Sequence, residues 1–142
     1  MTIEQFDDRP IVALIDDDQT FHVMTKIAVR ETGKVLKFLQ FFDGREALQF
    51  LYDQSRNRNE LPDIILLDLN MPEYDGWAFL DEFELIRDTL KKNIAIYVVS
   101  SSIDRQDIER AKKHFTVADF VTKPLTIDML NSLLSTPHKH PI

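Results

Sequence analysis

Hydrophobic residues along this chain follow two alternating patterns. Three short runs, at residues 11–15, 64–67 and 94–99, are continuously apolar. Continuous apolar runs are typical of parallel strands that are covered on both faces, so we expect these three to be the central strands of a sheet. Two further strands are predicted at residues 35–42 and 117–121.

Between these runs, apolar residues recur three or four positions apart, which predicts five helices. Strands that alternate with helices in this way predict an α/β domain built on a parallel sheet. His22 lies on the first predicted helix, and we expect it to be an exposed helical residue. The expected buried faces are marked, in chain order, by Phe21, Met24, Ile27 and Ala28; by Ala47, Leu48 and Leu51; by Trp77, Leu80 and Phe83; by Ile108, Ala111 and Phe115; and by Leu130, Leu133 and Leu134.

Composition narrows the class of protein. With 142 residues, 44% of them hydrophobic and 29% charged, the chain can bury one full core. We therefore expect a single domain over residues 1–142, with a core at about 10–134 and short disordered ends. There is no cysteine, no basic and apolar leader, and no run near the roughly 20 apolar residues of a membrane span, so a cytoplasmic location is expected. The formal charge of −7 disfavours nucleic acid as a partner.

Polar and charged residues follow the predicted strands. Asp16 and Asp17 come after the first strand, Asp68 after the third, Ser100 after the fourth and Lys123 close after the fifth. Right-handed crossovers bring the carboxyl ends of parallel strands to one edge of the sheet, where open α/β folds bind ligands. One aspartate after a strand is more often a turn former or a helix cap. Five such residues at one edge predict a functional site.

Three carboxylates in one pocket would repel each other unless a cation lay between them. Oxygen ligands with room left for water suit Mg²⁺, and Mn²⁺ in its place. The predicted ligands are the side chains of Asp17 and Asp68, with Asp16 acting closely or through water, and a backbone carbonyl near Asn70.

Asp68 is the predicted nucleophile of this site. Its carboxylate can attack a phosphoryl group in line, while the cation, the Lys123 ammonium and the Ser100 hydroxyl neutralise charge on the phosphoryl oxygens. The product would be an aspartyl phosphate.

These residues resemble the receiver domain of two-component response regulators over about residues 10–134. The motifs are the acidic pair in IVALIDDDQTF, the acceptor strand and loop in PDIILLDLNMPEYDGWAFL, the hydroxyl after IAIYVV, and the Lys-Pro pair in DFVTKPL. The resemblance implies a flavodoxin-like (βα)5 fold, a doubly wound five-stranded parallel sheet with strand order 2-1-3-4-5. It also implies phosphorylation of Asp68 by a histidine kinase or histidine phosphotransfer protein, magnesium dependence, and a cis peptide between Lys123 and Pro124.

The resemblance further implies a switch, in which a hydroxyl at the end of the fourth strand moves together with an aromatic residue of the fifth. Ser100 and Phe120 hold these positions. Because three serines are consecutive here, Ser101 is the alternative to Ser100. Residues 112–119 are about one residue longer than the family pattern and lack its glycine. The way in which family members bind their partners therefore applies less readily to this chain than their phosphorylation chemistry does.

We expect no linker or second domain after the fifth predicted helix, and therefore a stand-alone receiver that is no enzyme beyond its own phosphorylation and dephosphorylation. It would act as a phosphate relay or through a protein partner at the face of the fourth helix, fifth strand and fifth helix, as a monomer or a phosphorylation-dependent homodimer. Two alternatives stay open. One is a phosphorylation-independent adaptor. The other is a magnesium-dependent phosphohydrolase with Asp68 as nucleophile, which normally needs an acid where Asn70 stands.

Overall fold

The computed structural model describes residues 7–101 and 104–135. Its five parallel strands form one sheet in the order β2-β1-β3-β4-β5, which confirms the predicted flavodoxin-like α/β fold. The strands are β1 (Ile11–Ile15), β2 (Lys37–Phe41), β3 (Ile64–Leu67), β4 (Ala95–Ser100) and β5 (Val117–Thr122). The helices are α1 (Gln19–Thr32), α2 (Gly44–Asp53), α3 (Gly76–Ile86), the 3-10 turn η2 (Arg87–Thr89), α4 (Arg105–Lys113) and α5 (Ile127–Ser135). The expected disordered ends concern mainly residues outside the described ranges.

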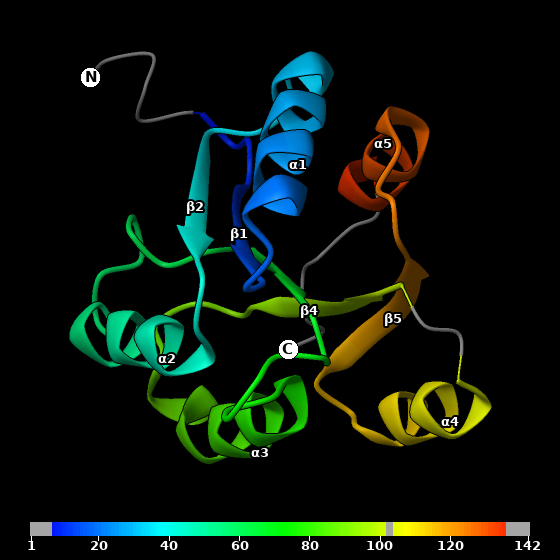
Figure 1. Ribbon diagram of the computed structural model, residues 1–142. Coiled ribbons are helices and arrows are strands. Elements are labelled where there is room, and N and C mark those ends of the chain that lie inside the picture. Colours follow the sequence, from blue (N-terminus) through cyan, green and yellow to red (C-terminus); the bar gives the residue numbers. More distant parts are fainter. Residues whose placement is uncertain (1–6, 102–103, 136–142) are drawn as a thin grey trace.

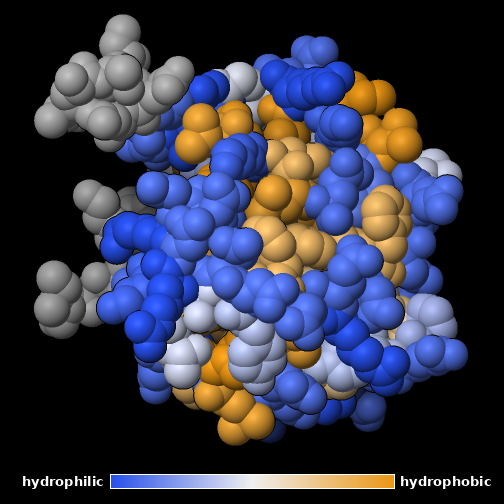
Figure 2. Space-filling view, turned by 90° about the vertical axis from the view of Figure 1, so that its left-hand side faces the viewer, coloured by the Kyte–Doolittle hydropathy of each residue, from blue (hydrophilic) through white to orange (hydrophobic). Residues whose placement is uncertain are grey.

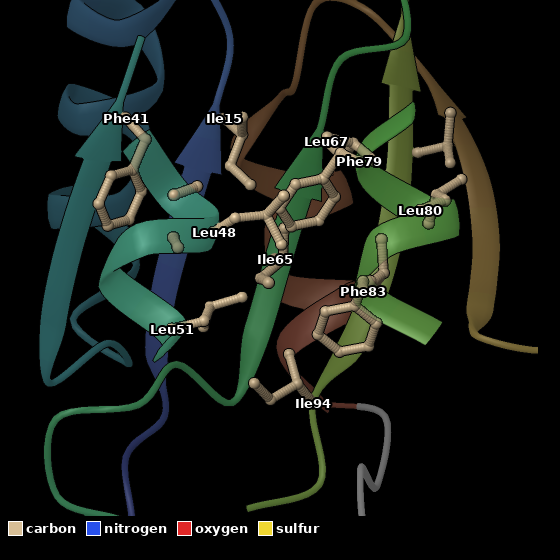
Figure 3. Packing of buried hydrophobic residues seen from close by; sticks show 14 of the residues in the cluster. Ile15, Phe41, Leu48, Leu51, Ile65, Leu67, Phe79, Leu80, Phe83 and Ile94 are labelled. Carbon is tan, nitrogen blue, oxygen red and sulfur yellow. The ribbon is translucent and has the colours of Figure 1, made fainter. Parts of the chain in front are cut away.

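Helices cover both faces of the sheet. Helices α1 and α5 lie on one face, and α2, α3 and α4 lie on the other (Figure 1). Every residue of β1 and β3 is buried, as expected for strands at the centre of a doubly wound sheet. The larger core lies between the sheet and helices α2 and α3, where aromatic and aliphatic side chains interleave (Figure 3). Its labelled members include Leu48 and Leu51 of α2, Phe79, Leu80 and Phe83 of α3, and Ile65 and Leu67 of β3.

The buried face of α1 differs from the predicted one. Met24 and Ile27 were expected in the core but are 52% and 57% exposed. His22, expected at the surface, is 1% exposed, and Thr25 is also buried. The prediction was right for Phe21 and Ala28 but wrong for Met24 and Ile27, because polar residues occupy the core positions that hydrophobicity assigned to those two. The residues that α1 buries are Phe21, His22, Thr25, Ala28 and Val29.

Helix α4 is held to the domain by little buried surface. Ala111 is its one buried residue, whereas α3 buries five. Phe115 was predicted on the buried face of this helix, but α4 ends at Lys113 and the Phe115 side chain is 74% exposed. The Arg87 guanidinium lies 4.7 Å from the centre of the Phe115 ring, a cation–π contact at the surface.

Strand β5 contains an irregularity within residues 112–119, the segment expected to be about one residue longer than the family pattern. Ile96 of β4 pairs with Val117, but the next residue, Tyr97, pairs with Asp119. Ala118 is thus left without a partner in the register, as in a β-bulge. From Tyr97 to Ser100 the β4–β5 ladder then continues in regular register.

Strand β2 is an edge of the sheet. Leu36 and Phe42, which flank it, are 40% and 42% exposed. The face of the molecule on this side carries hydrophobic side chains surrounded by polar ones (Figure 2).

Within the described residues, no helix has the length and apolar character needed to cross a membrane.

Candidate functional site

The carboxyl ends of four strands bring the predicted site residues together. The Asp16 amide donates to the carbonyl of the last β2 residue at 3.0 Å, and the Asp68 amide to that of the last β1 residue at 3.0 Å. The Lys123 amide donates to the Ser100 carbonyl at 2.9 Å. Each of these residues therefore continues the sheet ladder, which fixes where its side chain starts. The peptide between Lys123 and Pro124 is cis, as predicted.

Three carboxylates converge at this edge. Asp16, Asp17 and Asp68 each offer one oxygen, and these oxygens lie within 4.8 Å of one another. Asp16 is 0% and Asp68 4% exposed, whereas Asp17 faces solvent. Lys123 Nζ lies 2.7 Å from Asp16 Oδ2 and 3.9 Å from Asp68 Oδ2. A set of carboxylate oxygens that is open to water on one side fits a hard divalent cation.

The Asp68 carboxyl group sits in an environment that disfavours its charge. Burial, and then the negative charge of Asp16, raise its pKa from 3.8 to about 6. The Lys123 ammonium and the backbone amide of Asn70, which donates to Asp68 Oδ1 at 3.2 Å, oppose this rise. The ionised Asp68 carboxylate therefore lowers the stability of the folded protein.

Asp68→Asn is expected to stabilise the cation-free protein at neutral pH. A carboxyl group whose pKa is higher in the folded than in the unfolded chain binds more protons when folded, so stability falls as pH rises from about 4 to about 6. Replacement by a neutral amide removes that loss, and the free energy of unfolding should increase by roughly 1–3 kcal/mol at about pH 7.5. Urea denaturation with chelator present measures it. The gain should shrink as pH falls through 6 toward 4; a gain independent of pH would contradict this account.

Ser100 lies beside the carboxylates at the end of β4. It is 2% exposed, and the Asn70 side-chain amide donates to its Oγ at 3.3 Å. Ser101 is exposed, and Ser102 lies outside the described residues. Phe120 of β5 packs against the larger core, on the face that α3 and α4 cover. The structure thus brings Ser100, rather than Ser101, next to the acceptor loop.

Gly76 shapes the loop that follows Asp68, a role that sequence reasoning missed because the residue reads as an ordinary turn glycine. A Cβ atom at this position would lie 2.6 Å from the Asp68 carbonyl oxygen and 2.8 Å from Leu69 Cα. These distances are shorter than real Cβ contacts, and both neighbours are backbone atoms. The available signal was a glycine at the first position of a helix, directly after the N-capping residue Asp75.

Two residues of α1 were also missed as parts of the site. The Lys123 ammonium lies 4.2 Å from the centre of the Phe21 ring, a cation–π contact. His22 Nε2 lies 2.7 Å from the Asp16 carbonyl oxygen. Phe21 was predicted as a core residue only, and His22 as an exposed one. Their position five and six residues after Asp16, on the first turn of the helix that follows the acidic loop, was the available signal.

A model of the response regulator receiver domain matches residues 12–135, which is most of the chain. The chain belongs to this family. Among curated receiver-containing proteins, it is 30% identical over 125 residues to the sensor histidine kinase CheAY of Helicobacter pylori. That alignment covers 87% of this chain but 14% of the kinase, so the receiver spans a small part of that relative's length.

Solved receiver structures agree with this assignment. A two-component response regulator from Cytophaga hutchinsonii has a TM-score of 0.78 and 32% identity, covering 87% of this chain and 92% of that one. The Mn²⁺-bound form of response regulator Rcp1, a Synechocystis protein, has a TM-score of 0.66 and 25% identity, with 88% of each chain covered. The receiver fold inferred from sequence motifs is therefore confirmed by independent structures.

Proposed function

We propose that this receiver domain accepts a phosphoryl group on Asp68 and signals through phosphorylation-dependent contacts with another protein or by relaying the group. The observation that carries the proposal is the set of three converging carboxylates with Lys123 against them at the sheet edge. Asp68 is nearly buried yet lies beside the exposed Asp17, so a phosphodonor reaches it from one side.

The proposed donor is a histidine kinase or a histidine phosphotransfer protein. A relative named as a sensor histidine kinase contains a segment like this chain, which supports a partnership between the two kinds of module. The proposal includes a cytoplasmic location, where ATP-dependent kinases act. The proposed output surface is formed by α4, β5 and α5, and the domain would work as a monomer or as a phosphorylation-dependent homodimer.

Mg²⁺ is the proposed cation, with Mn²⁺ as a substitute. The carboxylates of Asp16, Asp17 and Asp68 would hold it, with a backbone carbonyl at Asn70 completing the protein's share. When bound, the cation supplies positive charge next to the phosphoryl oxygens. The Mn²⁺-bound form of Rcp1, a receiver of the same fold, supports this part of the proposal.

Phosphoryl transfer would use an Asp68 carboxylate oxygen as nucleophile. The oxygen forms a bond to phosphorus while the bond from phosphorus to the donor's imidazole nitrogen breaks, and that nitrogen keeps the electron pair. Lys123 Nζ, 3.9 Å from Asp68 Oδ2, is placed to offset negative charge on the phosphoryl oxygens. Ser100 Oγ, at the adjacent strand end, is the proposed hydroxyl partner of the aspartyl phosphate, with Phe120 following its movement.

Incubation with acetyl phosphate tests the proposal. We expect intact-mass spectrometry to detect one added phosphoryl group in the presence of Mg²⁺ and none with chelator. Peptide mapping after borohydride reduction of the acyl phosphate should place the group on Asp68. Failure to form an adduct, together with failure to bind beryllofluoride with Mg²⁺ present, would favour the phosphorylation-independent adaptor.

The phosphohydrolase alternative is not favoured by the site. Such enzymes normally place a second acid two residues after the nucleophile, and this chain has Asn70 there. The Asn70 side chain donates to Ser100 Oγ, so it lies against a hydroxyl that belongs to the receiver motif. A neutral amide at this position cannot act as the general acid or base of ester hydrolysis.

A further inference from the structure

His22 lies buried behind the acid pair that ends β1. Its side chain is 1% exposed, on the first turn of α1, and Nε2 is 2.7 Å from the Asp16 carbonyl oxygen. On the other side of the ring, Nδ1 lies 3.1 Å from the side-chain nitrogen of Gln40 in β2. The ring also packs on Phe42, with centroids 4.0 Å apart. One imidazole therefore joins α1, the end of β1 and the edge strand β2.

One tautomer satisfies both hydrogen bonds. A carbonyl oxygen can only accept, so Nε2 of His22 carries a proton. The Gln40 side-chain nitrogen can only donate, so Nδ1 presents its lone pair. Gln40 thus selects the ring form that donates to Asp16.

The carbonyl that His22 holds belongs to the peptide unit between Asp16 and Asp17. That unit is planar, so fixing its oxygen also fixes the direction in which the chain enters Asp17. On the far side, the Asp18 amide donates to Asp16 Oδ1 at 2.9 Å, which orients the Asp16 carboxylate. These two hydrogen bonds hold the carbonyl and the carboxylate of Asp16, and with them the start of Asp17.

We infer that His22 is a positioning residue, which with Gln40 holds the main chain of Asp16 and Asp17 in the orientation that binds the cation. The inference rests on the proposed function, in which these carboxylates are cation ligands. Groups that orient the ligands of a metal without touching the metal set its affinity, often by 10- to 100-fold. A buried histidine that served packing alone would change stability and leave cation affinity as it was.

A matched set of variants separates these two roles. His22→Phe keeps a buried ring against Phe42 and removes both nitrogens. His22→Gln places an amide N–H near the position of Nε2 and can restore the donor. Val29→Ala removes core contacts from the same helix, at a residue that is 4% exposed and lies two turns beyond His22, farther from the acid pair. Mg²⁺ titration followed by amide NMR gives the dissociation constant of each folded variant, and urea denaturation gives its stability.

We expect His22→Phe to weaken Mg²⁺ binding by about tenfold or more, and His22→Gln by no more than about threefold. Val29→Ala should be destabilised and bind Mg²⁺ like the parent chain. In the cation-free protein, the Asp18 amide should exchange faster in His22→Phe than in Val29→Ala at matched global stability. An Mg²⁺ affinity of His22→Phe within about twofold of the parent, with Asp18 exchange like that of Val29→Ala, would overturn the inference.

The parent chain provides a test that needs no variant. Ring ¹⁵N shifts should identify the tautomer of His22 that carries its proton on Nε2, and the opposite tautomer would overturn the assignment. If the parent chain neither binds Mg²⁺ nor accepts a phosphoryl group, the proposed function fails. The positioning role is then decided by Asp18 amide exchange alone.

Discussion

Asp68→Asn should form no adduct with acetyl phosphate under conditions that phosphorylate the parent chain. The substitution replaces the attacking carboxylate oxygen by an amide, which is a poor nucleophile, and keeps the size of the side chain. An amide oxygen can still accept the bond from the Asn70 amide that Asp68 Oδ1 accepts at 3.2 Å. The rate loss should therefore reflect chemistry rather than misfolding, and we expect it to exceed about 1,000-fold, as for loss of a nucleophile elsewhere.

Asp18→Asn is the matched control for this experiment. It makes the same chemical change two residues beyond Asp16, at the exposed N-cap of α1, where asparagine caps as well as aspartate. Its adduct should form at close to the parent rate. An adduct on Asp68→Asn at the parent rate would mean that another residue is the acceptor. Asp68→Asn should also be more stable than the parent chain. At residue 68, the carboxylate that the chemistry needs therefore lowers the stability of the fold.

Gly76→Ala should both destabilise the domain and slow phosphorylation. An added methyl group would meet the Asp68 carbonyl oxygen and Leu69 Cα, which are backbone atoms and move only with the acceptor loop. We expect a loss of roughly 1–3 kcal/mol in the free energy of unfolding, the usual range for overpacking a buried site. Because Asp68 moves with its carbonyl, the rate of adduct formation should fall together with stability. Urea denaturation and the acetyl phosphate assay measure the two effects.

Gly44→Ala provides the comparison, because Gly44 and Gly76 are each the first residue of a helix that follows an aspartate N-cap. A Cβ at Gly44 would lie 2.8 Å from Cδ2 of Tyr74, a side-chain atom of a half-buried ring that can turn aside. Alanine also favours the helix by up to about 1 kcal/mol over glycine. Equal losses in the two variants would contradict the steric account of Gly76.

Most of what could be predicted from sequence follows from the positions at which the predicted strands end. Continuous apolar runs identify the three central strands, and the carboxyl ends of parallel strands share one edge. The Lys123 ammonium lies within 4 Å of the carboxylates of both Asp16 and Asp68. The pairing of the strands, and not the local sequence, brings these side chains together. Topology alone therefore predicts a site of this kind.

Buried polar side chains limited how much of the remaining fold and site could be predicted. His22 and Thr25 complete the inner face of α1, yet their side chains are polar, so a hydrophobic pattern assigned that face to Met24 and Ile27. The burial of a histidine depends on a partner, here a carbonyl six residues back and an amide from another strand. The position of Gly76 directly after an N-cap indicates a turn, but its steric role could not be predicted because the backbone atoms involved lie close to it only in the folded chain.

The shallow attachment of α4 bears on how much free energy a conformational change would need. A modification shifts an equilibrium between two states only by the difference in its interaction with them. A helix that buries one alanine gives up little apolar contact when it tilts or slides, whereas α3, with five buried residues, would give up much more. Two helices on the same face of one sheet thus differ in mechanical compliance, and α4 is the one whose displacement would cost less buried apolar contact.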